Sequence, residues 1–183
     1  MSKMRRWSLA VGLGMALTVS IPATAVAAPP AEAAAEVVTT RVQKDTPDNM
    51  CLTASGGVGS QAYQDPCGTG EAQYWEFVGP YYAAQGGLYY LMRNRATGLC
   101  LEEMAGSETG SPVVQQTCDT AEPPRNSQAW GITSGDFQMI GSRTSELQIR
   151  LPGSTPGAGA VYSAFVEPHD ELAYKFLDEA PEW

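Results

Sequence analysis

The sequence contains a single histidine, His169, and no Gly-x-Ser-x-Gly motif. A Ser-His-Asp triad would have to use His169, which stands between a proline and an aspartate in an expected loop, so we expect no catalysis of this type. The four cysteines include no Cys-x-x-Cys pair, which argues against a zinc site. The sequence therefore predicts a protein that is not an enzyme and that carries no metal or cofactor.

Basic residues are also few. The chain has 11 Lys and Arg against 20 Asp and Glu, a formal net charge of −9. Residues 1–27 hold three of the basic residues and none of the acidic ones, so the rest of the chain carries 8 − 20 = −12. A chain this acidic lacks the positive surface that nucleic acids or anionic membranes require, and we expect neither as a partner.

One long apolar run is present, Leu9–Ile21, and it is too short to span a membrane. Lys3, Arg5 and Arg6 precede it, and Ala25–Ala27 offers a small-residue cleavage site, so residues 1–27 are predicted to be a secretory signal peptide. Cleavage after Ala25 and the twin-arginine route stay open as alternatives. We therefore expect a secreted, extracellular protein without membrane insertion.

Beyond the signal peptide the chain shows no sustained helical period. Residues 28–36 consist of Ala, Pro and Glu alone and are predicted to form a flexible lead. From Val37 onward, short apolar runs alternate with Gly, Pro, Asn, Asp and Ser, which is typical of an all-β barrel or sandwich. The remaining length suits one domain, which we place at residues 37–183.

This domain contains one motif three times. In the middle copy Cys100-Leu101 is followed by Gly110 to Cys118 and then by Gln128-Ala129-Trp130. The first copy has the same order: Cys51-Leu52, Gly59 to Cys67, and Gln73-Tyr74-Trp75. The third copy is degenerate: Leu147-Gln148-Ile149, Gly157 to Phe165, and Leu172-Ala173-Tyr174. The repetition predicts three structurally equivalent units.

Cys-Leu, Gly-x-x-Val-x-x-x-x-Cys and Gln-x-Trp together resemble the ricin B-type lectin repeat, of a secreted, actinobacterial-like kind. The resemblance implies a β-trefoil, three repeats arranged with pseudo-threefold symmetry. Four cysteines allow three pairings, and the repeat selects Cys51–Cys67 and Cys100–Cys118, one disulfide within each of the first two units.

In the last strand of each unit large apolar residues alternate with other residues, and this pattern predicts the core. Trp75, Trp130 and Tyr174 take equivalent places near the axis, and we expect them to be buried rather than to stack on sugars. Asn49 and Gly98 fall at equivalent turns where a left-handed backbone is expected. Glu146 takes that place in the third unit, and we count it as a sign of degeneration because glutamate adopts this conformation with difficulty.

The resemblance also implies where sugar would bind. The family's Asp, two residues after the first cysteine, is replaced by Thr53, Glu102 and Arg150. The platform two residues before the second cysteine is Asp65, Gln116 or Ser163, and the Asn-Gln pair reads Ala72-Gln73, Ser127-Gln128 and Glu171-Leu172. The middle unit alone keeps a polar cluster, and its candidate carbohydrate-binding residues are Glu102, Gln116, Ser127 and Gln128. Gln128 could instead make purely structural hydrogen bonds, and Glu103 is expected to face away from Glu102.

Three functions follow. The first is a secreted lectin-like module with degenerate sugar pockets, whose partner is a weakly bound glycan. The second is a non-enzymatic adaptor that uses the lectin fold to bind a protein partner in a secreted, toxin-like complex. Its expected contact surfaces are the lengthened loop Asp119–Asn126 and the acidic end of the chain. The third is a trefoil protease inhibitor, which would present Arg125 from the same loop.

Overall fold

A computed structural model of the chain describes residues 36–83, 86–133, 138–164, 171–179 and 181. The predicted signal peptide and nearly all of the predicted lead lie outside these ranges, as do Phe137, Phe165, His169 and Trp183. Within the described ranges, no helix has the length and apolarity needed to cross a membrane.

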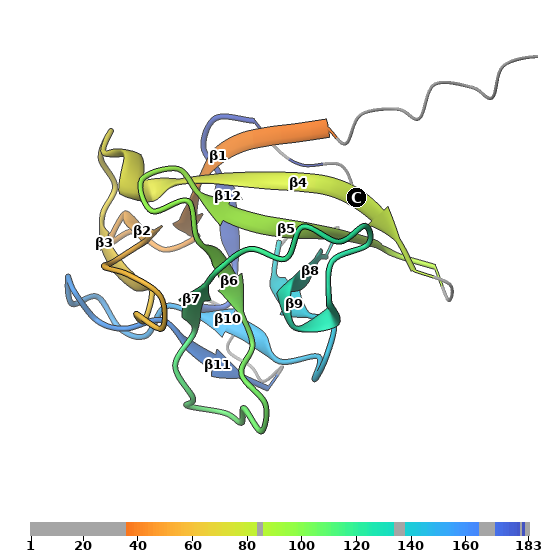
Figure 1. Cartoon of the computed structure of the whole chain (residues 1–183). Coiled ribbons are helices and arrows are strands. Elements are labelled where there is room, and N and C mark those ends of the chain that lie inside the picture. Colours follow the sequence, from red (N-terminus) through yellow and green to blue (C-terminus); the bar gives the residue numbers. More distant parts are fainter. Residues whose placement is uncertain (1–35, 84–85, 134–137, 165–170, 180, 182–183) are drawn as a thin grey trace, which may run out of the picture. The chain divides into compact units, whose positions relative to one another are not determined.

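Twelve strands join in one sheet and repeat in three groups of four (Figure 1). The first unit comprises β1 (Glu36–Lys44), β2 (Met50–Thr53), β3 (Tyr63–Pro66) and β4 (Tyr74–Tyr82). The second comprises β5 (Leu88–Asn94), β6 (Cys100–Glu102), β7 (Val114–Gln116) and β8 (Ala129–Ile132). The third comprises β9 (Ile140–Ser142), β10 (Gln148–Arg150), β11 (Val161–Ser163) and β12 (Tyr174–Phe176). Short 3₁₀ turns, η1 (Glu71–Gln73) and η2 (Asn126–Gln128), precede β4 and β8.

The first and last strands of each unit form the barrel. β1, β4, β5, β8 and β9 are neighbours in that order, β12 pairs with β1, and a bridge between Gln138 and Tyr174 joins β12 to the chain just before β9. The middle strands form three hairpins, β2–β3, β6–β7 and β10–β11. Each hairpin is attached to the barrel by the pairing of its own unit. This is the β-trefoil that the sequence predicts.

The hairpins meet in a ring of three backbone hydrogen bonds. Ala62 N donates to Val113 O (2.9 Å), Val113 N to Ala160 O (3.0 Å), and Ala160 N to Ala62 O (2.8 Å). All three residues are fully buried. Because each unit donates to the next and accepts from the third, the pseudo-threefold axis runs through this ring.

The glycine that begins the second part of each motif has one structural reason. Gly59, Gly110 and Gly157 all have positive φ angles, of 84°, 92° and 80°. Each donates its backbone N–H to the strand of a neighbouring unit, to Gln115, Tyr162 and Gln64 respectively, at 2.7 to 2.8 Å. A residue with a Cβ adopts this conformation with difficulty, which accounts for glycine in all three copies.

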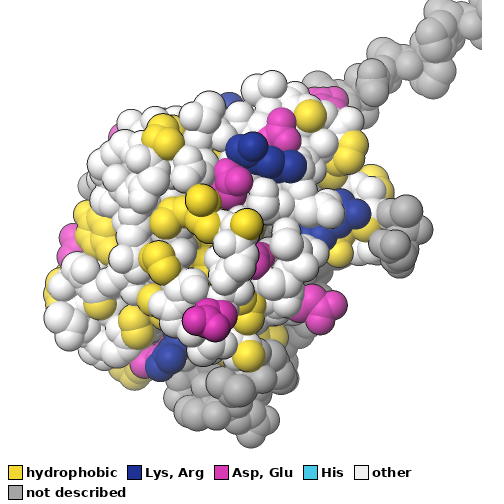
Figure 2. Space-filling view, turned by 60° about the horizontal axis from the view of Figure 1, so that its bottom comes forward, with side chains coloured by type: hydrophobic (Ala, Val, Ile, Leu, Met, Phe, Trp, Pro, Cys, Tyr) yellow, Lys and Arg dark blue, Asp and Glu magenta, His cyan; other side chains and the backbone are white. Residues whose placement is uncertain are grey.

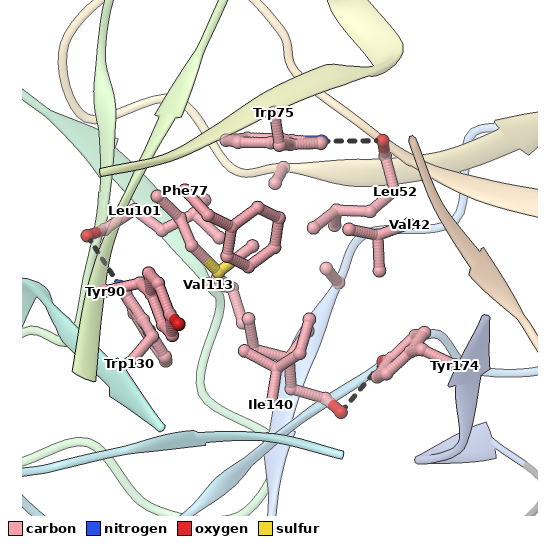
Figure 3. Packing of buried hydrophobic residues seen from close by; sticks show 14 of the residues in the cluster. Val42, Leu52, Trp75, Phe77, Tyr90, Leu101, Val113, Trp130, Ile140 and Tyr174 are labelled. Atoms are coloured by element: carbon pink, nitrogen blue, oxygen red, sulfur yellow. Dashed lines mark hydrogen bonds between the residues drawn. The ribbon is translucent and has the colours of Figure 1, made fainter. Parts of the chain in front are cut away.

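The core contains the three residues predicted to be equivalent. Trp75 and Trp130 are fully buried and Tyr174 is 2% exposed. Figure 3 shows how they point inward and bond to the backbone: Trp75 Nε1 donates to Leu52 O (2.9 Å) and Trp130 Nε1 to Leu101 O (3.2 Å). The Tyr174 hydroxyl donates to Ile149 O (2.9 Å) at the corresponding place. A tyrosine thus replaces tryptophan in the third unit and keeps both its burial and its hydrogen bond.

Two disulfides join Cys51 to Cys67 and Cys100 to Cys118, each within its own unit as the repeat implies. All four cysteines are thereby used. In the chain-entropy account, closing loops of 16 and 18 residues stabilises the fold by roughly 3 kcal/mol each.

Two expectations from the sequence need correction. Glu146 adopts a φ of 63°, as Asn49 (56°) and Gly98 (66°) do, so the third unit keeps the turn despite its glutamate. Glu36, which we placed in the flexible lead, is the first residue of β1. β4 itself continues past the barrel as far as Tyr82. There a shift in register between Val78 and Tyr81 lets the β4–β5 hairpin extend past the barrel (Figure 1).

Candidate functional site

Glu102, the last residue of β6, gathers three of its neighbours at one carboxylate. Gln128 Nε2 and Arg125 Nη2 donate to its Oε2 at 2.8 and 3.0 Å, and the Ser127 hydroxyl donates to its Oε1 at 3.3 Å. The Glu102 side chain is 14% exposed and that of Arg125 is 49% exposed. The structure therefore brings together three of the four candidate residues, with the glutamate partly open to solvent.

Gln128 is a structural clamp. It is fully buried, its Nε2 also donates to Thr117 O (2.9 Å), and its Oε1 accepts from Asp119 N (2.7 Å), so it holds the backbone on both sides of Cys118. Gln73 does the same around Cys67, through Pro66 O (2.9 Å) and Gly68 N (2.7 Å). The glutamine of each Gln-x-Trp motif therefore holds the end of its disulfide loop in place. Gln128 thus makes the structural hydrogen bonds that were the alternative to sugar binding.

The lengthened loop forms a strap that carries Arg125 to the site. Asp119 accepts hydrogen bonds from the backbone N–H of Ala121 (3.1 Å) and Arg125 (2.8 Å), which lower the pKa of its carboxyl group. Pro124 is buried, and Arg125 Nη2 reaches Thr117 O (3.3 Å) as well as Glu102. The equivalent connection in the first unit is four residues shorter, because Trp75 is eight positions after Cys67 whereas Trp130 is twelve positions after Cys118. The inserted residues therefore bring the Arg125 guanidinium into contact with the Glu102 carboxylate.

Beside Glu102 lies a hollow of about 380 Å³. It is lined by residues 102–107, from the end of β6 into the β6–β7 connection, and by Ser127, Thr144 and Ser145. Met104, 47% exposed, supplies the largest apolar surface there, and Gln116 Nε2 contacts its sulfur at 3.7 Å rather than facing the carboxylate. Gln116 thus lies at the side of the site. Its motif position had suggested a platform.

Glu103 also lines this hollow, and its carboxylate bonds to a different neighbour from that of Glu102. β6 ends at Glu102, so the alternation of a strand no longer applies to the next residue. The Glu103 side chain is buried and accepts a hydrogen bond from the Ser142 hydroxyl of β9. No sequence motif pointed to this contact, because it joins two units.

In the other two units, the side chains at the positions equivalent to Glu102 bond to neighbouring residues of their own unit. In the first unit Thr53 donates to Cys51 O (3.0 Å) and accepts from Gln73. In the third unit Arg150 forms an ion pair with Glu171, whose carboxylate also accepts from Gly153 N (2.7 Å). Burial alone would raise the pKa of Glu171, but the hydrogen bonds from Gly153 and Arg150 outweigh it and lower the pKa. Neither position presents an unoccupied carboxylate.

Figure 2 shows acidic and basic side chains scattered singly or in small groups over one face of the molecule, separated by uncharged surface. Across the described ranges, no three His, Cys, Asp or Glu residues come together in a way that could hold a metal ion.

Comparison with curated protein sequences finds no match. Solved structures with the same fold include ThreeFoil, a designed threefold-symmetric protein, with a TM-score of 0.63 and 19% identity over 77% of this chain and 99% of that one. A non-toxic homologue of type II RIPs from Momordica charantia (bitter gourd), in complex with α-methyl-D-galactoside, has a TM-score of 0.58 and 22% identity over 78% of this chain and 48% of that one. The Haemophilus ducreyi cytolethal distending toxin has a TM-score of 0.58 and 14% identity over 79% of this chain and 85% of that one.

This chain therefore spans about half the length of the bitter gourd chain that it matches. At such identities these structures establish the fold alone. The family model described as ricin-type beta-trefoil lectin domain-like matches residues 38–116 and again residues 71–164, together more than half of the sequence. The three units, two disulfides and Gln-x-Trp clamps of this chain agree with that match. The chain belongs to the ricin-type β-trefoil lectin domain-like family.

Proposed function

We propose that this protein is a secreted carbohydrate-binding lectin domain whose first and third pockets have degenerated and whose remaining site lies in the middle unit. The observation that carries the proposal is the hollow beside Glu102. There a carboxylate oxygen and the Ser127 hydroxyl lie next to the apolar surface of Met104. Vicinal sugar hydroxyls need such acceptors and donors, and the less polar face of a sugar ring packs on apolar side chains.

The same geometry predicts weak binding. Glu102 already accepts from Gln128, Ser127 and Arg125, so a sugar hydroxyl has to compete with internal partners for its oxygens. None of the described residues that line the hollow is aromatic. Few hydrogen bonds leave little net affinity after the ligand is immobilised, so we expect a Kd on the order of 0.1 to 10 mM.

The test is a titration of the mature protein with methyl α-D-galactoside, followed by NMR or calorimetry. We expect saturable binding by the wild type and none by Glu102→Ala. Glu171→Ala is the matched control, because it removes the carboxylate that pairs with Arg150 in the third unit's pocket, and it should bind as the wild type does. Tight binding that survives Glu102→Ala would place the site elsewhere.

A protein-binding adaptor is the second candidate. Two contacts favour it: Thr53 bonds within the first unit, and Arg150 pairs with Glu171 in the third unit. The fold is therefore kept while the pockets of these two units lack sugar-binding groups. Affinity capture of the tagged protein from its own culture supernatant, at low and high salt, tests this function. A stoichiometric companion released by salt would support it, and recovery of the protein alone together with sugar binding would exclude it. We do not propose protease inhibition, because Arg125 is bonded to Glu102 and Thr117.

A further inference from the structure

Arg143, the residue that follows β9, differs from every other described lysine and arginine. Seven of these basic side chains form ion pairs with carboxylates within the described residues: Arg41, Lys44, Arg93, Arg95, Arg125, Arg150 and Lys175. Arg143 forms none there, although acidic residues outnumber basic ones by 20 to 11 in the sequence. Its guanidinium instead lies over the Tyr89 ring, 4.7 Å from the ring centroid. Stacking uses one face of the guanidinium and leaves the N–H groups at its edge available to an anion.

A second hollow, of about 310 Å³, lies beside this guanidinium on the outer side of β5, β8 and β9. Gly131 and Gly141 are paired across β8 and β9 and are among its lining residues. A Cβ at Gly141 would come within 2.8 Å of the Gln148 amide nitrogen, and one at Gly131 would touch the Tyr89 ring at 3.5 Å. The absence of side chains at these two positions therefore leaves room for the hollow. Its volume is in the range of small-molecule sites.

The hollow also contains an acceptor that lacks a donor. Gln148 Nε2 donates to Glu146 O (3.1 Å), but its Oε1 is buried and has no hydrogen-bond partner among the described residues. Buried amide oxygens are normally paired. Because the terminal torsion of glutamine is soft, this oxygen can turn toward a hydroxyl group that enters the hollow.

We propose that this hollow binds an acidic sugar of the hexuronate type. Arg143 receives the sugar carboxylate through the edge of its guanidinium, and Gln148 accepts a ring hydroxyl. The two strands bearing Gly131 and Gly141 supply the surface against which the sugar ring lies. The site is on the barrel wall and shares no residue with the hollow beside Glu102. Glu146 also lines it, and its negative charge opposes an anionic ligand.

The experiment is a titration of the ¹⁵N-labelled mature protein with sodium D-glucuronate, with methyl β-D-glucoside as the neutral probe. We expect saturable shifts of the Gly131 and Gly141 amide resonances with glucuronate and none with the glucoside. Arg143→Gln should weaken binding about tenfold or more, because it removes a charge-assisted contact. Glu146→Gln should strengthen binding severalfold by removing the opposing charge. If Arg143→Gln fails to fold, Arg143→Lys, which keeps the charge, takes its place as the test variant.

Arg95→Gln is the matched control. Arg95 also lies over a tyrosine ring, 5.7 Å from the centroid of Tyr74, so this variant makes the same charge change elsewhere. It should bind glucuronate as the wild type does, and so should Glu102→Ala, which separates this site from the proposed galactoside site. Unchanged affinity in Arg143→Gln would overturn the proposal. So would equal binding of the neutral glucoside, or the absence of saturable shifts at Gly131 and Gly141.

Discussion

Replacing Arg125 with alanine should strengthen the binding of galactosides. In the structure Arg125 Nη2 donates to Glu102 Oε2 at 3.0 Å, which occupies the oxygen that a sugar hydroxyl would use. The Arg125 side chain is 49% exposed, so the pair is screened and is worth about 1 kcal/mol. A contact of that strength keeps the site closed roughly 85% of the time, and its removal should lower the Kd about sixfold.

The assay is the methyl α-D-galactoside titration at pH 7 and physiological salt, with wild type and Arg125→Ala side by side. Arg95→Ala is the control, because Arg95 is 42% exposed and forms a comparable ion pair with Glu71, on the first unit's η1 turn. It should leave the Kd unchanged. An Arg125→Ala protein that binds the galactoside no better than wild type would refute the reasoning. Weaker binding would show that Arg125 contacts the sugar itself.

Three further outcomes are expected from the core and from the first turn. Trp130→Ala should lower the free energy of unfolding by about 3–5 kcal/mol through cavity formation, and an unchanged denaturation midpoint would show that Trp130 is not in the core. Tyr174→Phe should cost about 1–2 kcal/mol, because Ile149 O loses its buried donor; equal stability to the wild type would mean that the hydrogen bond contributes nothing. Burial would raise the pKa of Asp48, but hydrogen bonds led by that from Lys44 lower it to about 2. A depressed carboxyl pKa stabilises the fold above the unfolded-state value, and this stability is lost as pH falls through the folded value. The wild type should therefore lose about 2 kcal/mol more than Asp48→Asn between pH 4 and pH 2, measured by denaturant titration, and parallel losses would contradict the pairing with Lys44.

The repeat predicted the fold because its cysteine pair and its Gln-x-Trp clamp bond within their own unit, and its glycine is required by its own backbone conformation. A glycine with positive φ, a cysteine pair and a Gln-x-Trp clamp each have a local physical reason, so three copies placed twelve strands in order. Tyr174 could be aligned with Trp75 and Trp130 by its spacing alone. The hydroxyl bond to Ile149 O that makes it equivalent became visible with the structure.

The candidate site was harder to predict, because its decisive contacts cross between segments. The motif identified Glu102, Ser127 and Gln128, but the strap's Arg125 has no counterpart in the first unit's shorter connection. Glu103 meets Ser142 of the next unit, and Arg143 meets Tyr89 of the preceding one. Such pairs depend on how the units pack together, so they cannot be predicted from the sequence of one repeat. The turn at Glu146 shows the converse: a conformation unfavourable for its residue is imposed by the strands on either side.

The ring of hydrogen bonds among Ala62, Val113 and Ala160 has a consequence for how such a protein can change. Its donors and acceptors are all main-chain atoms, so the ring constrains only the size of the three side chains at the axis. Mutations elsewhere in a unit can erase its ligand chemistry without disturbing the neighbours that complete it. The third unit has no cysteine at the first position of its motif and neither the glutamine nor the tryptophan of its clamp, yet it still closes the ring. Recognition can therefore drift in one third of the molecule while the other two thirds hold its shape.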